Sequence, residues 1–200
     1  MDWTRTAAFY NSQLPLERAA LVAAVALAEP HRDDVLLDVG TGTGGLLREL
    51  ARRRDQPRNV IGVDISAAML AKAHTLPNGW ALETADARRL PFAEGTFSVV
   101  TAAYLLHVVD AAARRQIIRE CHRVLRTGGR LVTVTPAWPR TWVARALYSP
   151  LAAAAGSSGG PPAGFRPLDP SSELEEATFR IAATRYVGRG YPSLCVLATR

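Results

Sequence analysis

A run of glycines between a buried strand and a helix is the feature that most constrains how this chain can fold. The segment Asp38–Gly45 begins within the mostly apolar stretch 35–39 and precedes Leu46–Leu50, whose apolar residues recur at helical spacing. A short continuous apolar stretch is typical of a strand that is buried on both faces of a parallel sheet. Glycine lets the backbone turn sharply and lets a ligand approach without meeting a Cβ atom. The pattern therefore predicts a strand, a turn that can bind a ligand, and a helix.

Strand-like and helix-like segments alternate along most of the chain. Glycines at 128–129 are expected to end the last long helix, because a left-handed residue often follows a helix. Pro15 is expected in the first turn of the first helix, where its missing N–H costs nothing. Further strands are expected at residues 60–64, 81–84, 97–102 and 131–135, and helices at 14–28, after the N-cap Ser66, and at 111–125. This alternation predicts a doubly wound α/β fold.

The pattern changes after residue 136. Residues 137–170 contain Trp138, Trp142, Tyr148 and a Gly/Ser/Pro-rich stretch at 156–162. This composition predicts a short amphipathic helix and a mobile loop, which together form a lid or acceptor-binding insertion beside an apolar pocket.

A hairpin is expected at the C-terminal end. After a short helix that begins near Ser171, two strand-like stretches at 179–187 and 193–199 are joined by Gly188–Gly190. Such a short connection requires antiparallel strands, since a parallel crossover takes a dozen or more residues. We therefore expect a single domain over residues 1–200, with a seven-stranded, Rossmann-like, mostly parallel sheet that ends in an antiparallel hairpin.

Composition excludes several other classes of protein. Apolar residues make up 48% of the 200 residues and charged residues 21%, which is typical of a globular domain. The cysteines Cys121 and Cys195 are too few for a disulfide framework or a zinc site, so a reduced, cytoplasmic compartment and no metal are expected. The longest apolar run, Ala19–Ala28, is too short for an integral membrane segment and lacks a cleavage site, so it predicts a helix.

The positive charge is dispersed. The formal net charge is +6, which alone would suggest nucleic acid or an anionic membrane. Lys72 is the one lysine among 24 basic residues, and the arginines are spread along the chain. The densest run, Arg52–Arg54, closes a predicted helix and indicates a solvated helix end. No nucleic-acid partner is expected, and the oligomeric state stays open.

Taken alone, the glycine segment is ambiguous. Gly40, Gly42 and Gly45 satisfy the G-x-G-x-x-G pattern of dinucleotide-binding folds, and Asp64 lies at about the right distance to hold a ribose. A nicotinamide-dependent oxidoreductase is therefore one alternative. Against it stand the acidic residue after the third strand, the terminal hairpin and the lack of a second catalytic domain.

Acidic residues at the ends of three successive strands favour another family. Asp38, Asp64 and Asp86 lie at or just after these ends, which share one crevice in a doubly wound sheet. This array resembles the class I S-adenosylmethionine-dependent methyltransferases. Residues 86–100 resemble the family pattern D-A-x-x-L-P-F…F-D-x-V, and residues 124–131 resemble R-V-L-K-P-G-G-x-L. The resemblance covers most of the chain and points to the small-molecule branch that includes the ubiquinone/menaquinone-biosynthesis type.

Three positions depart from the family pattern. Ser98 stands where Asp is usual, Thr127 where Pro is usual, and Thr178 where Gly commonly precedes the Phe. All three are expected to be structural positions outside the ligand contacts.

The resemblance implies S-adenosylmethionine as the cofactor and assigns residues to its parts. The glycines would let the backbone approach the amino-acid end of the cofactor, and the acidic residues would accept hydrogen bonds from it. The amino-acid end would contact Gly40, Gly42 and Gly44, with Asp38 nearby, and its methionine part would contact Ala102 or Ala103. The ribose would bind to Asp64. The adenine would contact Ile65, Asp86 and the N–H of Ala87.

Three further residues could act on or around the acceptor. His107 could be a general base, because its ordinary pKa lies near 6.5, or it could order the loop instead. Tyr104 could form a wall of the acceptor pocket, and Tyr10 could close over the cofactor. The predicted reaction is methyl transfer to a small apolar or aromatic acceptor by in-line displacement, for which alignment is the main requirement. A non-catalytic S-adenosylmethionine-binding protein remains a second alternative.

Overall fold

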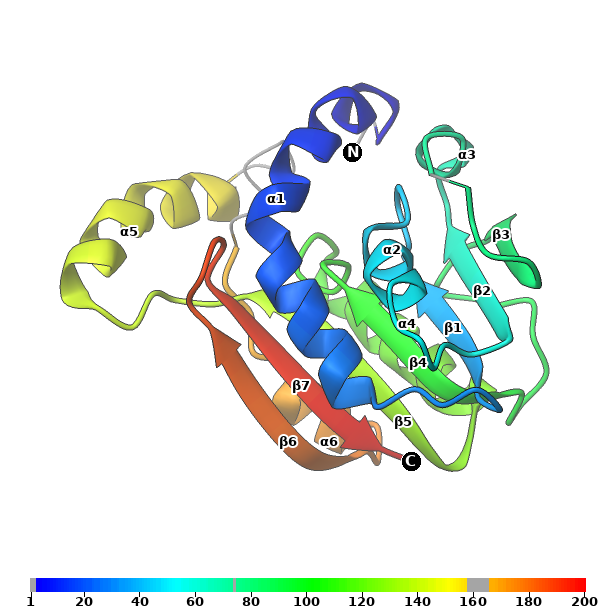
Figure 1. Cartoon of the computed structure of the whole chain (residues 1–200). Coiled ribbons are helices and arrows are strands. Elements are labelled where there is room, and N and C mark those ends of the chain that lie inside the picture. The colour runs from blue at the N-terminus through cyan, green and yellow to red at the C-terminus, as the bar shows by residue number, and fades with distance from the viewer. Residues whose placement is uncertain (1–2, 74, 158–165) are drawn as a thin grey trace.

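The computed structural model describes residues 3–73, 75–157 and 166–200; for residues 3–14, 151 and 154–157 it describes the backbone alone. Within these residues a seven-stranded sheet has the order β3-β2-β1-β4-β5-β7-β6 (Figure 1). The strands are β1 (Val35–Val39), β2 (Asn59–Asp64), β3 (Trp80–Thr84), β4 (Phe97–Ala103), β5 (Leu125–Pro136), β6 (Arg180–Val187) and β7 (Ser193–Thr199). The helices are α1 (Trp3–Ala28), α2 (Gly45–Ala51), α3 (Ala67–Leu70), α4 (Ala111–Val124), α5 (Trp142–Ser157) and α6 (Ser171–Glu176).

Strand directions confirm the expected topology. The strands from β3 to β5 are parallel, and β7 pairs antiparallel with both β5 and β6. The chain builds β2 and β3 on one side of β1 and then crosses to build β4 and β5 on the other. The carboxyl ends of β1 and β4 therefore border a topological switch point, where ligands bind in open α/β sheets.

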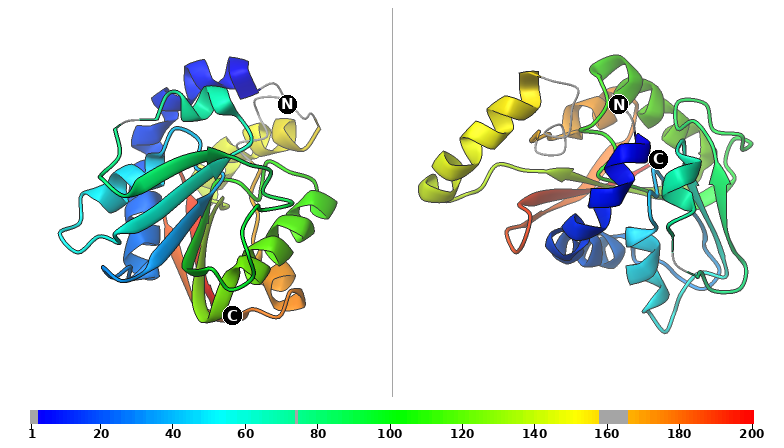
Figure 2. Two further views of the ribbon diagram at one scale, coloured as in Figure 1. Left: turned by 90° about the vertical axis from the view of Figure 1, so that its right-hand side faces the viewer. Right: turned by 90° about the horizontal axis from the view of Figure 1, so that it is seen from above.

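Helices cover both faces of the sheet. Figure 2 (right) shows α1 and α2 on one side of the strands and α4 and α6 on the other. Successive residues of β1 point to opposite faces: Leu36 packs in the cluster with Leu21 of α1, and Leu37 in the cluster with Ile117 of α4. This two-sided burial explains why the sequence of β1 is mostly apolar.

Helix α1 is longer than expected. It begins at Trp3, so Pro15 lies inside the helix, and the expected start near residue 14 was wrong. Proline lacks an N–H, and its ring crowds the carbonyl four residues earlier, so a helix that continues through it bends. In Figure 1 the N-terminal part of α1 lies at an angle to the rest of the helix.

Helix α4 ends before the glycine pair. Leu125 is already extended, with φ −80° and ψ 134°. Gly128 has a left-handed φ of 73°, but it lies inside β5, where its N–H donates to the Arg200 carbonyl at 2.9 Å. The expectation that Gly128-Gly129 ends the helix was therefore wrong, because the left-handed glycine belongs to the first part of a longer β5.

The three departures from the family pattern fall at structural positions. The buried Ser98 hydroxyl donates to Asp34 Oδ1 at 2.7 Å and accepts from the Val35 N–H at 3.0 Å. Thr178 has a φ of 67°, a left-handed conformation that β-branched residues rarely adopt, which explains why glycine is usual there. Thr127 is exposed.

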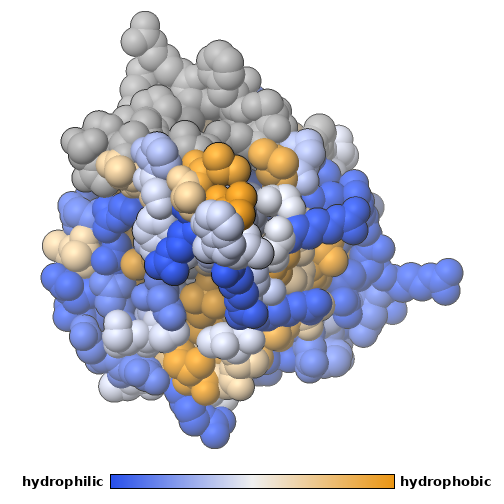
Figure 3. All heavy atoms as spheres, turned by 90° about the vertical axis from the view of Figure 1, so that its left-hand side faces the viewer, coloured by the Kyte–Doolittle hydropathy of each residue, from blue (hydrophilic) through white to orange (hydrophobic). Residues whose placement is uncertain are grey.

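Helix α5 confirms that residues 137–170 contain a helix, but its exposed side carries apolar residues, so it is not amphipathic in the expected sense. It projects beyond the sheet (Figures 1 and 2), with Tyr148 buried and Leu147 74% exposed. Trp142 is 82% exposed, so it does not wall a pocket in this structure. Figure 3 shows this side of the molecule, where orange apolar residues interrupt the hydrophilic surface. Most of the expected loop at 156–162 lies outside the described residues.

Two expectations about the chain as a whole can be compared with the structure. Cys121 and Cys195 are both free and buried. Among the described residues, no helix is both long enough and apolar enough to cross a membrane.

Candidate functional site

The glycine turn joins the end of β1 to the start of α2. Gly40, Gly42 and Gly44 have φ values of 70°, 56° and 75°, a region that residues with a Cβ atom seldom adopt. The N–H groups of Gly40 and Thr41 both donate to the Val63 carbonyl, at 2.8 and 2.9 Å. These two hydrogen bonds hold the turn against β2. The positive φ values of the turn are the reason that glycine is favoured at these three positions.

Asp64, at the end of β2, is fixed by N–H groups from two loops. Its Oδ2 accepts from Gly42 at 2.9 Å, and its Oδ1 accepts from Ser66 at 2.9 Å. Burial raises the pKa of Asp64, and these backbone hydrogen bonds oppose the rise. A carboxylate has about four acceptor positions, so both oxygens can still accept from the two hydroxyls of a ribose. The adjacent Ile65 is 56% exposed and presents an apolar surface beside the carboxylate.

Asp38 is almost completely buried at the end of β1. Its Oδ1 accepts a 2.7 Å hydrogen bond from the Thr101 hydroxyl of β4. Burial raises the pKa of Asp38 to about 6, the Thr101 hydrogen bond opposes this rise, and the charge of Asp64 adds to it. A nearby positive charge would stabilise the ionised form of such a buried carboxyl and lower its pKa again.

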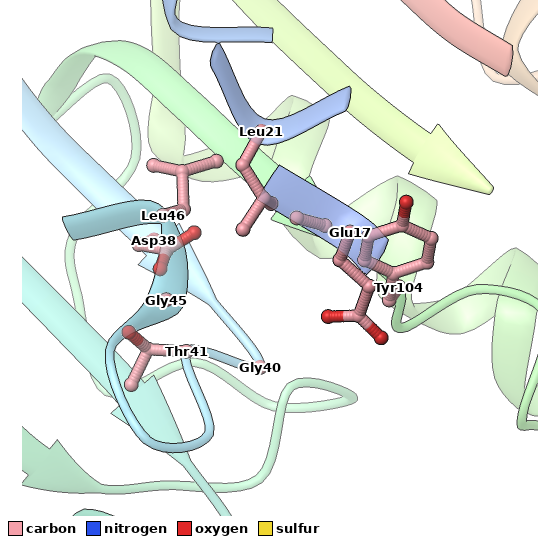
Figure 4. A pocket seen from close by; sticks show the side chains of 9 residues that line it. Glu17, Leu21, Asp38, Gly40, Thr41, Gly45, Leu46 and Tyr104 are labelled. Atoms are coloured by element: carbon pink, nitrogen blue, oxygen red, sulfur yellow. The ribbon is translucent and has the colours of Figure 1, made fainter. Parts of the chain in front are cut away.

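A pocket that is open to solvent lies beside the glycine turn (Figure 4). Its walls come from α1, the end of β1, the glycine turn, the start of α2 and the end of β4. The lining residues are Glu17, Leu21, Asp38, Gly40, Thr41, Gly45, Leu46, Ala103 and Tyr104. The pocket thus contains four residues that were expected to bind the cofactor or acceptor, namely Asp38, Gly40, Ala103 and Tyr104.

Glu17 was missed at the sequence level. It is 5% exposed on α1, and burial raises its pKa to about 7. In the sequence it is one charged residue at the polar start of a helix, a position where a solvated side chain is usual. Its place in the pocket depends on how α1 packs across the ends of β1 and β4, which no local pattern predicts.

Thr41 places an unsatisfied hydroxyl in the same pocket. The residue is 7% exposed, and its Oγ1 makes no hydrogen bond of normal geometry with the described residues, although the hydroxyl helps to lower the pKa of the neighbouring Asp38. Buried polar groups are rarely left unpaired without a reason. This hydroxyl is therefore available to a bound ligand.

Asp86 follows β3, but its carboxyl is engaged by Arg88. The Arg88 Nη2 donates to Oδ2 at 2.6 Å, its Nε donates to both oxygens at 3.0 Å, and this pairing lowers the pKa of Asp86. The Asp86 and Arg88 side chains are 35% and 51% exposed. An exposed pair contributes little to stability, so Arg88 can release an oxygen to another donor. Ala87 between them is half-buried.

Tyr104 forms a wall of the pocket in a strained backbone conformation, with a φ of 54°. The Ser193 hydroxyl donates to the Tyr191 carbonyl at 2.8 Å, so in the 2.7 Å contact with Tyr104 the tyrosine is the donor. Burial raises the pKa of Tyr104, and the Ser193 hydrogen bond opposes the rise. The phenol therefore stays neutral, which suits a wall of the pocket better than a base.

Tyr104 is the inner member of an aromatic row that leads outward from the pocket. Its ring centroid lies 6.0 Å from that of Tyr191, which lies 6.4 Å from Tyr148 of α5. Trp138 packs edge-on against Tyr148 at 5.9 Å. The hydroxyl groups of Tyr148 and Tyr191 are 3.2 Å apart. The row connects the pocket to the insertion at 137–170.

His107 is 2% exposed and packs edge-on against the Tyr104 ring, with centroids 6.1 Å apart. It is not among the residues that line the pocket, so this geometry favours the role in ordering the loop over that of a base.

Of the remaining residues that were expected to bind the cofactor, one lines the pocket and one does not. Ala103 lines the pocket, whereas Ala102 is 1% exposed in the core. The side chain of Tyr10 lies outside the described residues. In the part of the chain that the structure describes, no group of three or more His, Cys, Asp or Glu residues could hold a metal ion.

Comparison with known proteins identifies the central part of the chain. The family described as "Methyltransferase domain" matches residues 36–129, from β1 to the first part of β5. This part of the chain is similar to a methyltransferase domain. The matched residues include the glycine turn and all three acidic residues, so the expected resemblance to methyltransferases is confirmed over this segment.

A curated relative shares this part of the chain. The ubiquinone/menaquinone biosynthesis C-methyltransferase UbiE of Geotalea uraniireducens is 36% identical over 120 residues, which are 56% of this chain and 50% of the relative. The chain spans about half the length of the curated relatives it matches.

Solved structures share the whole fold at lower identity. A SAM-dependent methyltransferase from Aquifex aeolicus has a TM-score of 0.68 and 18% identity, covering 92% of this chain and 90% of its own. The [4+2]-cyclase SpnF has a TM-score of 0.67 and 20% identity, covering 91% and 81%. The likeness establishes the Rossmann-like fold, and the cyclase shows that this fold supports more than one reaction.

Proposed function

We propose that this protein binds S-adenosylmethionine and transfers its methyl group to a small apolar or aromatic acceptor. The observation that carries this proposal is the set of carboxylates after three adjacent parallel strands, in the order β3-β2-β1, around a left-handed glycine turn. Asp38, Asp64 and Asp86 are those carboxylates. Their spacing along one sheet edge matches a ligand with an amino-acid end, a ribose and a base.

The described residues fit this cofactor. Asp64 is positioned by two backbone N–H groups and keeps acceptor capacity for a ribose, and Ile65 offers an apolar surface for a base. A Cβ atom at Gly44 would meet only Ala73 among the described residues, at 3.7 Å, so the backbone at Gly44 is open to close approach. The unpaired Thr41 hydroxyl supplies a further polar contact in the pocket.

When bound, S-adenosylmethionine supplies a methyl group that is already activated by the positive charge on its sulfur. The chain's own residues then have to orient the acceptor and exclude water, and such positioning can lower a barrier substantially. Tyr104 stays neutral and lines the pocket, where it can contact an acceptor. A base is needed only where the acceptor must lose its proton early.

The aromatic row supports an apolar or aromatic acceptor. Tyr104, Tyr191, Tyr148 and Trp138 provide ring faces and edges that pack well against another ring. A relative named for ubiquinone/menaquinone biosynthesis is in keeping with such an acceptor. We assign residues 137–170 as the cover of this site, with Tyr148 of α5 as its contact to the body of the protein.

Two features favour this function over the alternatives. The antiparallel β7 between β5 and β6 and the carboxylate after β3 count against a nicotinamide-dependent oxidoreductase. Seven arginines pair with acidic residues at sites spread over the described part of the molecule, which counts against a single basic surface for nucleic acid. The two buried, free cysteines fit a reducing, cytoplasmic compartment.

The proposal is tested by following a labelled methyl group. The purified protein is incubated with methyl-labelled S-adenosylmethionine and either 1,4-naphthohydroquinone or demethylmenaquinol, and the organic extract is analysed by mass spectrometry. We expect a product heavier by one labelled methyl group, formed together with S-adenosylhomocysteine. Binding of S-adenosylhomocysteine without any labelled product would favour the non-catalytic alternative.

A further inference from the structure

Glu17 introduces a second buried carboxyl into the pocket beside the glycine turn. It is 5% exposed and comes from α1, outside the matched residues 36–129. Figure 4 shows its carboxyl pointing into the space between Tyr104 and the glycine turn. Asp38 lies on the opposite side of the same pocket and is 1% exposed.

The ionisable carboxyl groups that line this pocket are not balanced by basic side chains in the part of the chain that the structure describes. Among the described residues, those that line it include two carboxyls and no lysine, arginine or histidine. Removing a carboxylate from water is costly unless a positive charge or several donors compensate. That cost is visible in the pKa values of Glu17 and Asp38, which burial raises to about 7 and about 6.

A third observation also points to a ligand at this place. The Thr41 hydroxyl lines the same pocket, is nine-tenths buried, and makes no hydrogen bond of normal geometry with the described residues. A ligand that brings a positively charged group with several N–H donors would satisfy Glu17, Asp38 and Thr41 together.

We propose that Glu17 binds the α-ammonium group at the amino-acid end of the cofactor, across the pocket from Asp38. The inference rests on the proposed function and extends it to α1. Helix α1 then contributes a charged contact to the cofactor in addition to covering the sheet. The nucleoside part of the cofactor, held at Asp64 and Asp86, makes no contact with Glu17 in this assignment.

Two ligands that share the nucleoside test this assignment. S-adenosylhomocysteine carries the amino-acid end, whereas 5′-methylthioadenosine has the same adenosine and sulfur without it. Both are titrated by calorimetry into the wild type, Glu17→Gln and the control Glu175→Gln, an exposed glutamate on α6. Glutamine has the shape of the protonated acid, so the variant keeps the packing, which its melting temperature verifies.

We expect Glu17→Gln to weaken S-adenosylhomocysteine binding by about 10- to 100-fold, because a hydrogen bond to a charged group is lost. The affinity for 5′-methylthioadenosine should change by less than about twofold by the same reasoning. The control should alter neither. Unchanged affinity for S-adenosylhomocysteine, or an equal loss for both ligands, would overturn the role of Glu17. A wild type that bound neither ligand would overturn the proposed function itself.

Discussion

The Gly42 N–H donates a 2.9 Å hydrogen bond to Asp64 Oδ2, which ties the glycine turn after β1 to the end of β2. Asp64 is therefore both a candidate ligand for the ribose and a support for the loop that approaches the rest of the cofactor. These two roles cannot be separated by removing the carboxyl, so its substitution should affect both.

We expect Asp64→Ala to weaken S-adenosylhomocysteine binding by about 1.5–3 kcal/mol, because a charged acceptor is lost at the ribose. The loop should also loosen, since the N–H groups of Gly42 and Ser66 lose their partner. Calorimetry measures the first effect, and hydrogen exchange at residues 40–45 measures the second. Retained affinity in the variant would place the ribose elsewhere.

Asp86 is paired with the Arg88 side chain, whereas Asp64 is held by backbone N–H groups. If Asp86 accepts from the adenine amino group, Asp86→Ala should weaken binding about tenfold, because a hydrogen bond to a charged group is lost. Arg88→Gln should leave the affinity within about threefold, since an exposed ion pair contributes little. The two variants are compared by the same titration. A larger loss for Arg88→Gln than for Asp86→Ala would contradict the adenine role of Asp86.

Glu17 should make the stability of the ligand-free protein depend on pH. Its pKa rises from 4.5 to about 7 on folding, so the folded state holds a proton that the unfolded state releases. Stability therefore falls as pH rises from about 4.5 to 7 and stays lower above that range. Tyr104, which directly follows β4, and Asp38 of β1 line the same pocket. Burial raises both of their pKa values, and neither supplies a positive charge.

The variant Glu17→Gln removes this cost. We expect it to raise the free energy of unfolding at pH 8 by at most about 3 kcal/mol, from the size of the pKa change. At pH 4, where the wild-type carboxyl is protonated in both states, the two proteins should be equally stable. Urea denaturation at both pH values measures this, with Glu175→Gln as control. Equal stability at pH 8 would mean that Glu17 is not buried as a costly carboxyl.

Thr178 stores strain at the turn before β6. It adopts a φ of 67°, and its hydroxyl contacts His122 Nε2 at 3.1 Å on the surface. Thr178→Gly should stabilise the protein by about 1 kcal/mol, because the left-handed conformation costs a non-glycine residue about that much. Thr178→Ala keeps the strain and loses the same hydroxyl, so it should be less stable than the glycine variant. Equal melting temperatures for the two variants would refute the strain.

Most of the sheet was predictable because its determinants are local. The apolar stretch 35–39, the glycine turn and the short turn 188–190 each specify an element through periodicity or backbone sterics, and the structure contains all three. The N-cap role of Ser66 is confirmed by its bond from the Met69 N–H. The start of α1 was not predictable, since Pro15 is compatible both with a first turn and with a kink.

The site was only partly predictable, for a physical reason. Asp64 and Asp38 follow from strand ends, which the topology places together. Glu17 and the aromatic row depend on how α1, α5 and the β6–β7 turn pack around the ends of the strands, at large sequence separations. The exposure of Trp142 likewise depends on the projection of α5 beyond the sheet.

The central claim, that this crevice binds S-adenosylmethionine and not a nicotinamide, is tested most directly by the melting temperature of the wild type with S-adenosylhomocysteine, NAD or NADP. A ligand present at 100 times its dissociation constant adds about 2.7 kcal/mol of stability, which a melting curve resolves easily. We predict a clear rise in melting temperature with S-adenosylhomocysteine and none with NAD or NADP. A rise with NAD or NADP and none with S-adenosylhomocysteine would contradict the account.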